Sequence, residues 1–193
     1  EGAQAAPPAP LFAMTGIGVY GIMLGGWGSN NKYSLLGAIR AASQMVSYEL
    51  AMGLSIVALV MMTSTLSMGG IVDYQVEHGW NILRQPLGFL IFIVCAFAET
   101  NRSPFDMPEC ETELVGGYHT EFSSMKLGFF IFAEYVNMFI SGAVMATLYF
   151  GAYDVPGLAN SGWNPNLITI LGAMAMLAKP LFFIFFFMWA RWA

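Results

Sequence analysis

Residues 50–72 read LAMGLSIVALVMMTSTLSMGGIV, a run that contains no charged side chain. An α-helix needs about 17 to 25 apolar residues to cross the hydrocarbon of a bilayer, so this run is long enough to span a membrane. The whole chain is 57% hydrophobic and 10% charged, whereas soluble domains are about 25% charged. We therefore expect a polytopic helical membrane protein.

Apolar segments on both sides of this run are separated by short polar connections. We expect one integral membrane domain, an all-α transmembrane helical bundle that covers residues 1–193. Residues 1–10, EGAQAAPPAP, are predicted to be an extramembrane linker. Pro180 predicts a kink in the last span. The five expected spans are residues 11–27, 38–71, 80–101, 125–150 and 166–189.

Basic residues are divided unequally between the two sides of the expected bundle. One side carries only Arg84, and the other carries Lys32, Arg40, Arg102, Lys126 and Arg191. Because cytoplasmic connections are enriched in Lys and Arg, the second side is predicted to be cytoplasmic. Residues 73–85 and 152–163 are then expected on the opposite side.

Charge and cysteine usage exclude other classes of function. The net charge is −5 with seven basic residues, so no cationic surface for nucleic acid is expected. Cys95 and Cys110 form neither a disulfide framework nor a metal-ligand pattern, and we expect no metal site. The stretch TGIGVYG, residues 15–21, matches a dinucleotide-binding pattern but lacks the βαβ context. We interpret its glycines as small residues that let membrane helices pack closely.

Three ionisable residues are expected inside the membrane: Glu49, Glu134 and Lys179. A charge near the bilayer centre costs at least about 2.5 to 3.5 kcal/mol, so each predicts a functional site facing protein or water. Lys179 is a candidate proton relay, although a long lysine side chain can also extend to the membrane surface.

The stretch AETNRSPFDMPECETELVGGYHTEFSSMK, residues 98–126, joins two of the expected spans and contains six of the twelve acidic residues. Proline and paired glycine interrupt any helix here, so residues 102–124 are predicted to form an irregular, ordered cytoplasmic loop. Large apolar residues alternate with the acids and would draw the loop into the protein. Crowded, partly dehydrated carboxylates have raised and coupled pKa values, as a proton relay requires. A merely solvated acidic loop is the alternative. The six acids are Glu99, Asp106, Glu109, Glu111, Glu113 and Glu121.

This stretch resembles the long loop of one family, the membrane subunit of respiratory complex I that is the H-type subunit in bacteria and is called ND1 in mitochondria. The segments GWGSNNKYSLLGAIRAASQMVSYE (26–49) and FFIFAEY (129–135), and the closing W-x-R (189–191), are similar as well. The family has eight transmembrane helices, and this chain would correspond to the third through the seventh.

The resemblance implies the quinone-chamber subunit of a proton-pumping NADH:quinone oxidoreductase, which couples quinone reduction to proton translocation. It implies ubiquinone or menaquinone as the substrate, with FMN and iron–sulfur clusters only in partner subunits. The partners would be hydrophilic quinone-site and iron–sulfur subunits and small membrane-arm subunits. The acids of the implied glutamate-lined channel are Glu49, Glu99, Glu109, Glu111, Glu113, Glu121 and Glu134. The implied quinone-chamber residues are Lys32, Arg40, Arg102, Phe105 and Asp106.

Two rival functions share some of these features. The first is the homologous membrane subunit of a membrane-bound hydrogenase or a ferredoxin- or formate-linked complex, which the identity of the hydrophilic partner subunits would distinguish. The second is a secondary ion transporter, which would predict inverted internal repeats, and none is visible in the sequence. We expect a multi-pass protein of the bacterial inner membrane rather than the mitochondrial inner membrane.

Overall fold

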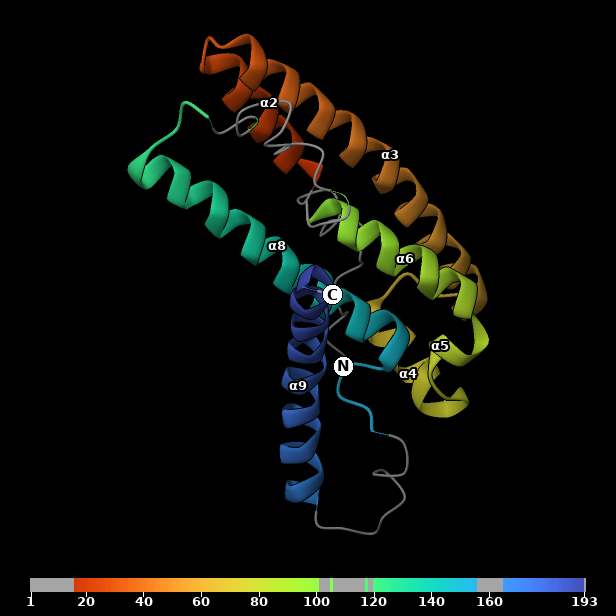
Figure 1. Ribbon diagram of the computed structural model, residues 1–193. Coiled ribbons are helices and arrows are strands. Elements are labelled where there is room, and N and C mark those ends of the chain that lie inside the picture. Colours follow the sequence, from red (N-terminus) through yellow and green to blue (C-terminus); the bar gives the residue numbers. More distant parts are fainter. Residues whose placement is uncertain (1–15, 101–104, 106–116, 118–119, 156–164, 193) are drawn as a thin grey trace.

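The computed structural model describes residues 16–100, 105, 117, 120–155 and 165–192. Within these residues the chain forms α-helices and no β-strand (Figure 1). This confirms the all-α fold class. The helices are α2 (Gly18–Gly28), α3 (Lys32–Thr63), α4 (Met68–His78), α5 (Asn81–Arg84), α6 (Pro86–Glu99), α8 (Ser124–Phe150) and α9 (Pro165–Trp192).

The second expected span differs from the helix observed. Helix α3 begins at Lys32, because the Asn31 side chain accepts a hydrogen bond from the backbone N–H of Tyr33 at 3.0 Å. It ends at Thr63, and the C-cap residue Ser64 adopts a left-handed conformation with φ of 54°. The polar run Thr63–Ser67 offers side-chain partners to the backbone and so interrupts the helix. A separate helix, α4, then begins after the N-cap Ser67.

Residues 73–85, expected as a connection, are largely helical, since they contain most of α4 and all of α5. The helical conformation is interrupted at Gln85. Helix α6 then begins at Pro86, and the backbone N–H that proline lacks has no helical partner in the first turn, so no hydrogen bond is lost. Helix α6 has 14 residues, so it is shorter than the expected span 80–101.

Among the described residues, α3, α8 and the stretch Asn166–Ala190 of α9 are long and apolar enough to cross a membrane, by length and composition. Their large apolar side chains point outward: Met61, Phe132 and Phe185 are 76%, 66% and 67% exposed. Such a surface suits hydrocarbon rather than water. The chain is therefore a membrane protein.

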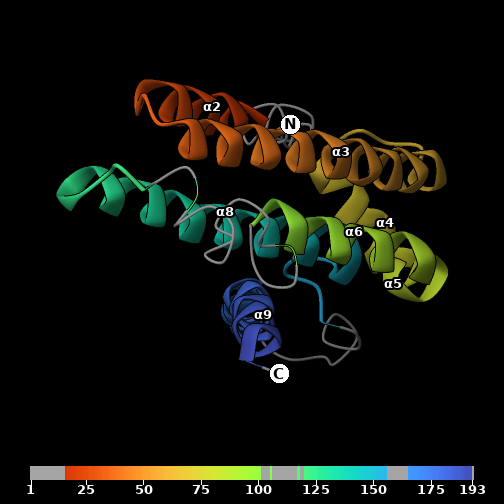
Figure 2. The ribbon, with the colours of Figure 1, turned by 45° about the horizontal axis from the view of Figure 1, so that its top comes forward.

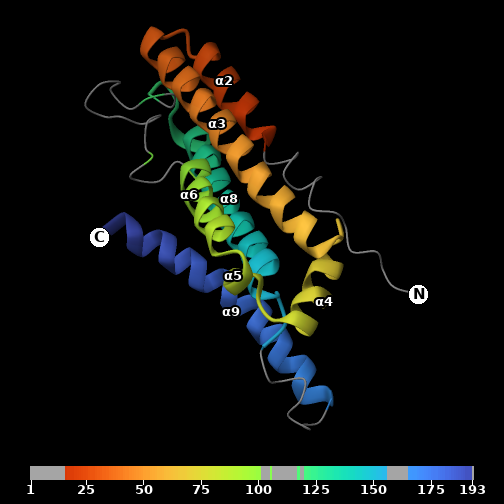
Figure 3. The same ribbon diagram turned by 90° about the vertical axis from the view of Figure 1, so that its right-hand side faces the viewer.

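The helices pack in layers, with α2 and α3 in one layer, α6 and α8 in the next, and α9 beyond them (Figure 2). Helix α9 runs at a steep angle to α8 (Figure 1), and the view turned by 90° shows α9 on the side of α6 and α8 that faces away from α2 and α3 (Figure 3). The main core lies between α3, α6, α8 and α9, where Leu59, Phe92, Tyr149 and Phe187 are buried. Helices α3 and α8 start at the same end of the bundle, and α6 runs back between them, so the α2–α3 turn lies beside the segment before α8 (Figure 1).

A glycine permits one close contact between α2 and α3, at Gly26 rather than at Gly18 or Gly21. A Cβ at Gly26 would collide with Ala38 and lie 2.9 Å from the backbone oxygen of Ser34, so α2 packs directly on α3 through Gly26. A Cβ at Gly18 or Gly21 would meet no described atom within 4 Å. Among the described residues the close packing expected for TGIGVYG is therefore not seen at these two glycines, whereas a Cβ at Gly16 would lie 3.0 Å from Oε1 of Glu49.

We expect Gly26→Ala to destabilise the full-length protein by about 1–3 kcal/mol, because the added methyl group overpacks the α2–α3 contact. The matched control is Gly21→Ala on the same helix, where a methyl group meets open space and should change the stability by about 1 kcal/mol or less. Thermal unfolding of the detergent-solubilised protein measures both. Equal melting temperatures for the two variants would contradict the contact.

Candidate functional site

The α2–α3 turn and the entry to α8 are joined by polar and aromatic contacts. Asn31 donates a hydrogen bond from Nδ2 to Oε1 of Glu121 at 2.8 Å. Phe122 packs against Phe130, with the ring centroids 5.3 Å apart, and both rings lie beside Gly25. The described part of the acidic stretch nearest α8 is thus attached to the start of α3.

Gln44 on α3 contacts two other segments, the end of α6 and Phe105, which is the first described residue after Thr100. Its Nε2 donates to the backbone oxygens of Ala98 at 3.1 Å and Phe105 at 2.7 Å. The Phe105 ring meets Tyr48, one helical turn further along α3, in an edge-on contact with centroids 5.4 Å apart. Phe105, a predicted chamber residue, is therefore held by α3 through its backbone and its ring.

Glu99 is the last residue of α6, and it is only 7% exposed. The next residue, Thr100, is 1% exposed and donates from Oγ1 to the backbone oxygen of Phe97 at 3.1 Å. Carboxylates are rarely buried to this extent unless the surrounding protein compensates the lost hydration. The end of α6 therefore places an acidic group inside the protein.

Glu49 and Glu134 lie on different helices and are both partly buried. The Glu49 carboxylate rests against the backbone of Gly16, where Oε1 would lie 3.0 Å from an added Cβ. Gly16 therefore makes room for the carboxylate. On α8, Asn137 is three residues beyond Glu134, and its buried Oδ1 has no hydrogen-bond partner among the described atoms. Both helices carry polar groups toward the protein interior at membrane depth.

The other predicted site residues divide into two groups. Lys32 is the exposed first residue of α3, and Arg40 is partly buried two turns later on the same helix. The remaining ones lie outside the described residues: Arg102, Asp106, Glu109, Glu111 and Glu113. Within the described part of the chain, no group of three or more His, Cys, Asp or Glu side chains could hold a metal ion.

Lys179 lies apart from the acids of the predicted proton relay. Its Nζ donates to the backbone oxygens of Phe150 at 2.6 Å and Asp154 at 2.5 Å, and it lies 5.4 Å from the ring centroid of Trp80. Phe150 ends α8, and Glu134 is about 24 Å away along that helix at 1.5 Å per residue. A cation at a helix C-terminus is stabilised by the helix dipole, which gives Lys179 a structural reason to be charged there.

Sequence reasoning missed two further side chains at the same helix end. Gln75 and Asn81 are fully buried, and they donate to the backbone oxygens of Thr147 at 3.0 Å and Leu148 at 2.9 Å. The last carbonyls of a helix lack partners within it, and in hydrocarbon water cannot supply them. With Lys179, these amides satisfy the end of α8. The only sequence signal was the presence of amide residues beside apolar ones in residues 73–85.

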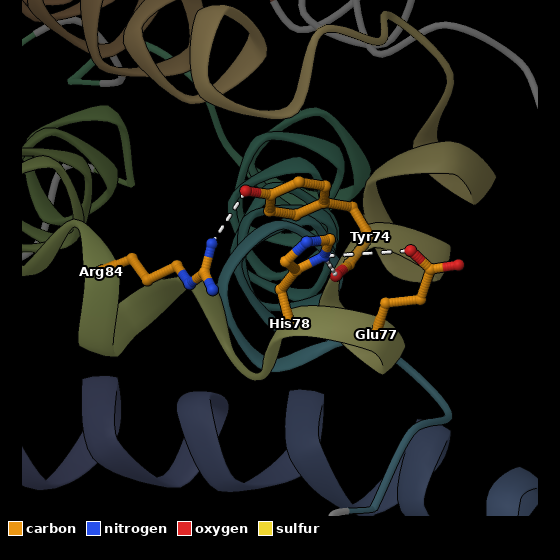
Figure 4. A network of polar contacts seen from close by, with 4 residues as sticks. All are labelled: Tyr74, Glu77, His78 and Arg84. Carbon is orange, nitrogen blue, oxygen red and sulfur yellow. Dashed lines mark hydrogen bonds and ion pairs between the residues drawn. The ribbon is translucent and has the colours of Figure 1, made fainter.

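A polar cluster on α4 and α5 occupies the same end of the bundle (Figure 4). Arg84 donates from Nη1 to the Tyr74 hydroxyl at 2.8 Å, and the Tyr74 ring stacks on His78 with centroids 4.4 Å apart. The His78 Nδ1 lies 3.9 Å from Oε2 of Glu77. Nearby, burial and the carboxylate of Asp73 raise the pKa of Tyr153. His78 is exposed.

With this geometry in place, the chain can be compared with known proteins. The family model described as "NADH dehydrogenase" matches residues 9–193. The chain belongs to the NADH dehydrogenase family. This confirms the resemblance found in the sequence.

Three members of the family show how close the similarity is. The chain is 64% identical over 182 residues to an H-type NADH-quinone oxidoreductase subunit of Cytophaga hutchinsonii, covering 94% of the chain and 53% of the relative. It is 61% identical over 184 residues to the H-type subunit of Flavobacterium psychrophilum, covering 94% and 54%. It is 49% identical over 196 residues to NADH-quinone oxidoreductase subunit 8 of Rhodothermus marinus, covering 94% and 56%. The chain thus spans about half the length of the curated relatives it matches.

We expect Lys179→Met to destabilise the full-length protein by about 1.5–3 kcal/mol, because the end of α8 loses charge-assisted hydrogen bonds. The control is Lys126→Met, at an exposed position in the first turn of α8, which should change the stability by less than about 0.5 kcal/mol. Thermal unfolding in detergent compares the two. A stable Lys179→Met protein that fails only in proton translocation would instead support the relay predicted from the sequence.

Proposed function

We propose that this chain is part of the quinone-chamber subunit of a proton-pumping NADH:quinone oxidoreductase. In this role it couples the reduction of a quinone to proton translocation through a glutamate-lined channel. The relatives are named NADH-quinone oxidoreductase subunits, which supports quinone as the substrate and other subunits of that complex as partners. Electrons would come from FMN and iron–sulfur clusters held by the partner subunits.

The burial of Glu99 where Gln44 joins α3 to α6 and Phe105 carries this proposal. A carboxylate removed from bulk water responds strongly to a new charge nearby, because the low local dielectric strengthens electrostatic interactions. Two-electron reduction of a quinone creates negative charge and consumes protons. A buried acid beside the chamber can therefore sense the reaction and supply protons to it.

The predicted site residues would have separate roles in this reaction. Phe105 would offer an apolar ring to the chamber, and Glu99 is buried at the end of α6. Glu49 on α3 and Glu134 on α8 would continue the proton path into the membrane. Arg40 and Lys32 on α3, with Arg102 and Asp106, would line the chamber. The loop acids Glu109, Glu111, Glu113 and Glu121 would admit protons from the cytoplasmic side.

The rival functions gain less support from these observations. The names of the relatives favour NADH-quinone oxidoreductase over a hydrogenase-type complex. A transporter that binds its ion between Glu134 and Lys179 would need these side chains together, whereas Lys179 contacts the far end of α8. Since the relatives are bacterial proteins, we assign the chain to a bacterial inner membrane.

We expect Glu49→Gln and Glu134→Gln to lower coupled proton translocation by about 100-fold or more, as is typical when a proton-transfer group is removed. Glutamine keeps the shape of the side chain but cannot release a proton. Each variant is made in the full-length protein within its native complex. Quinone-dependent NADH oxidation and acidification across sealed vesicles are measured per assembled complex.

The matched control is Glu77→Gln, an exposed acid on α4 that contacts only His78 among the described residues. It should translocate protons at the unmodified rate. Full proton translocation by both Glu49→Gln and Glu134→Gln would refute the proposed channel.

A further inference from the structure

Gln44 combines three features that a purely apolar α3 would not need. It is 6% exposed, it donates two hydrogen bonds to other segments, and its own Oε1 is buried without a partner among the described atoms. An unpaired buried amide oxygen costs about 1–3 kcal/mol. A leucine here would avoid that cost, so the hydrogen bonds made by Nε2 are the feature that the glutamine adds.

The two acceptors show what those hydrogen bonds hold. One is the carbonyl of Ala98, whose peptide bond leads directly to Glu99. Because a peptide bond is planar, a fixed carbonyl also fixes the backbone of the next residue. The other acceptor is the carbonyl of Phe105, whose ring contacts Tyr48. One side chain thus sets the positions of a buried acid and of an aromatic ring predicted to face the quinone.

Gln44 also relates these groups to Glu49, the acid on α3. Residues 44–49 form little more than one turn of helix, so Gln44, Tyr48 and Glu49 are one rigid unit. Within that unit, Gln44 holds the backbone before Glu99, Tyr48 holds the Phe105 ring, and Glu49 lies against Gly16. The distance between Glu49 and Glu99 therefore depends on the amide of Gln44.

We propose that Gln44 is a positioning residue for proton delivery during quinone reduction. Its amide holds the Glu99 backbone and the Phe105 ring at a fixed separation from Glu49. Gln44 itself carries no proton. The proposal rests on the proposed function, since it concerns the same acids, but it predicts an effect for a residue that cannot titrate.

The fold provides a matched control in Gln75. This glutamine is also fully buried, and its Nε2 also donates to the carbonyl of a neighbouring helix, at Thr147 of α8. It lies at the opposite end of the bundle, where it contacts Asn81 and the last turn of α8. A loss of stability alone should affect Gln44→Met and Gln75→Met alike, whereas an effect on the reaction should appear only for Gln44→Met.

The experiment compares these two variants in the full-length protein within the native complex, with a soluble ubiquinone analogue as the substrate. Per assembled complex, Gln44→Met should lower kcat for quinone reduction by about 10- to 100-fold, as expected for a reacting group displaced by about 1 Å. The KM for the quinone should change by less than about threefold, because the substrate contacts remain. Gln75→Met should keep kcat within about twofold of the unmodified complex.

A second variant, Gln44→Glu, should have a kcat that depends on pH in a way that a purely structural role of Gln44 would not produce. Ionised glutamate can only accept hydrogen bonds, whereas the protonated form can donate one. The ratio of its kcat to that of the unmodified complex should therefore rise as the pH falls, while the ratio for Gln75→Glu should stay flat. This pair also carries the test if Gln44→Met does not assemble.

Each result separates the two proposals. If Glu49→Gln loses proton translocation but Gln44→Met keeps the kcat of Gln75→Met, or if the ratio for Gln44→Glu is independent of pH, the positioning role is wrong and the proposed function stands. If Glu49→Gln and Glu134→Gln both translocate protons fully, the proposed function fails. A fall in kcat confined to the Gln44 variants, with the pH-dependent ratio, supports the positioning role.

Discussion

The absence of water in hydrocarbon is the constraint on which the rest of this structure depends. A backbone carbonyl at a helix end must find a donor inside the protein, because an unpaired polar group there costs several kcal/mol. The fold meets this need repeatedly with side-chain N–H groups. Gln44 serves the carbonyls at Ala98 and Phe105, while Gln75, Asn81 and Lys179 serve the end of α8.

This use of amides has a cost that is visible in the structure. An amide carries an oxygen as well as its N–H groups, and the oxygens of Gln44 and Asn81 remain buried without partners among the described atoms. Gln75 avoids part of the problem, because its oxygen accepts the backbone N–H of Asn81 at 3.4 Å. The two ends of the bundle thus use the same chemistry, and only the end at Gln44 adjoins Glu99.

Much of the fold could be predicted from the sequence, because charge-free runs and the scarcity of charged residues depend only on composition. The break after Thr63 was missed because a membrane span and a pair of helices separated by a short polar run have similar hydropathy. Glu49 and Glu134 could be singled out because a carboxylate in an apolar segment is conspicuous. The role of Gln44 could not be predicted, because it depends on contacts with Ala98 and Phe105, which are distant in sequence. The structural contacts of Lys179 were hidden for the same reason.

The 14 residues of α6 have a consequence for the electric field in the membrane. At 1.5 Å per residue the helix rises about 21 Å, roughly 9 Å less than the hydrocarbon thickness. Its C-terminal end is enclosed by protein, since Glu99 and Thr100 are buried, whereas Pro86 and Leu87 at its start are exposed. A polar group at the buried end therefore faces protein rather than lipid. We expect the transmembrane voltage to fall over a shorter path beside α6, so that a proton at Glu99 would already have crossed part of the insulating layer.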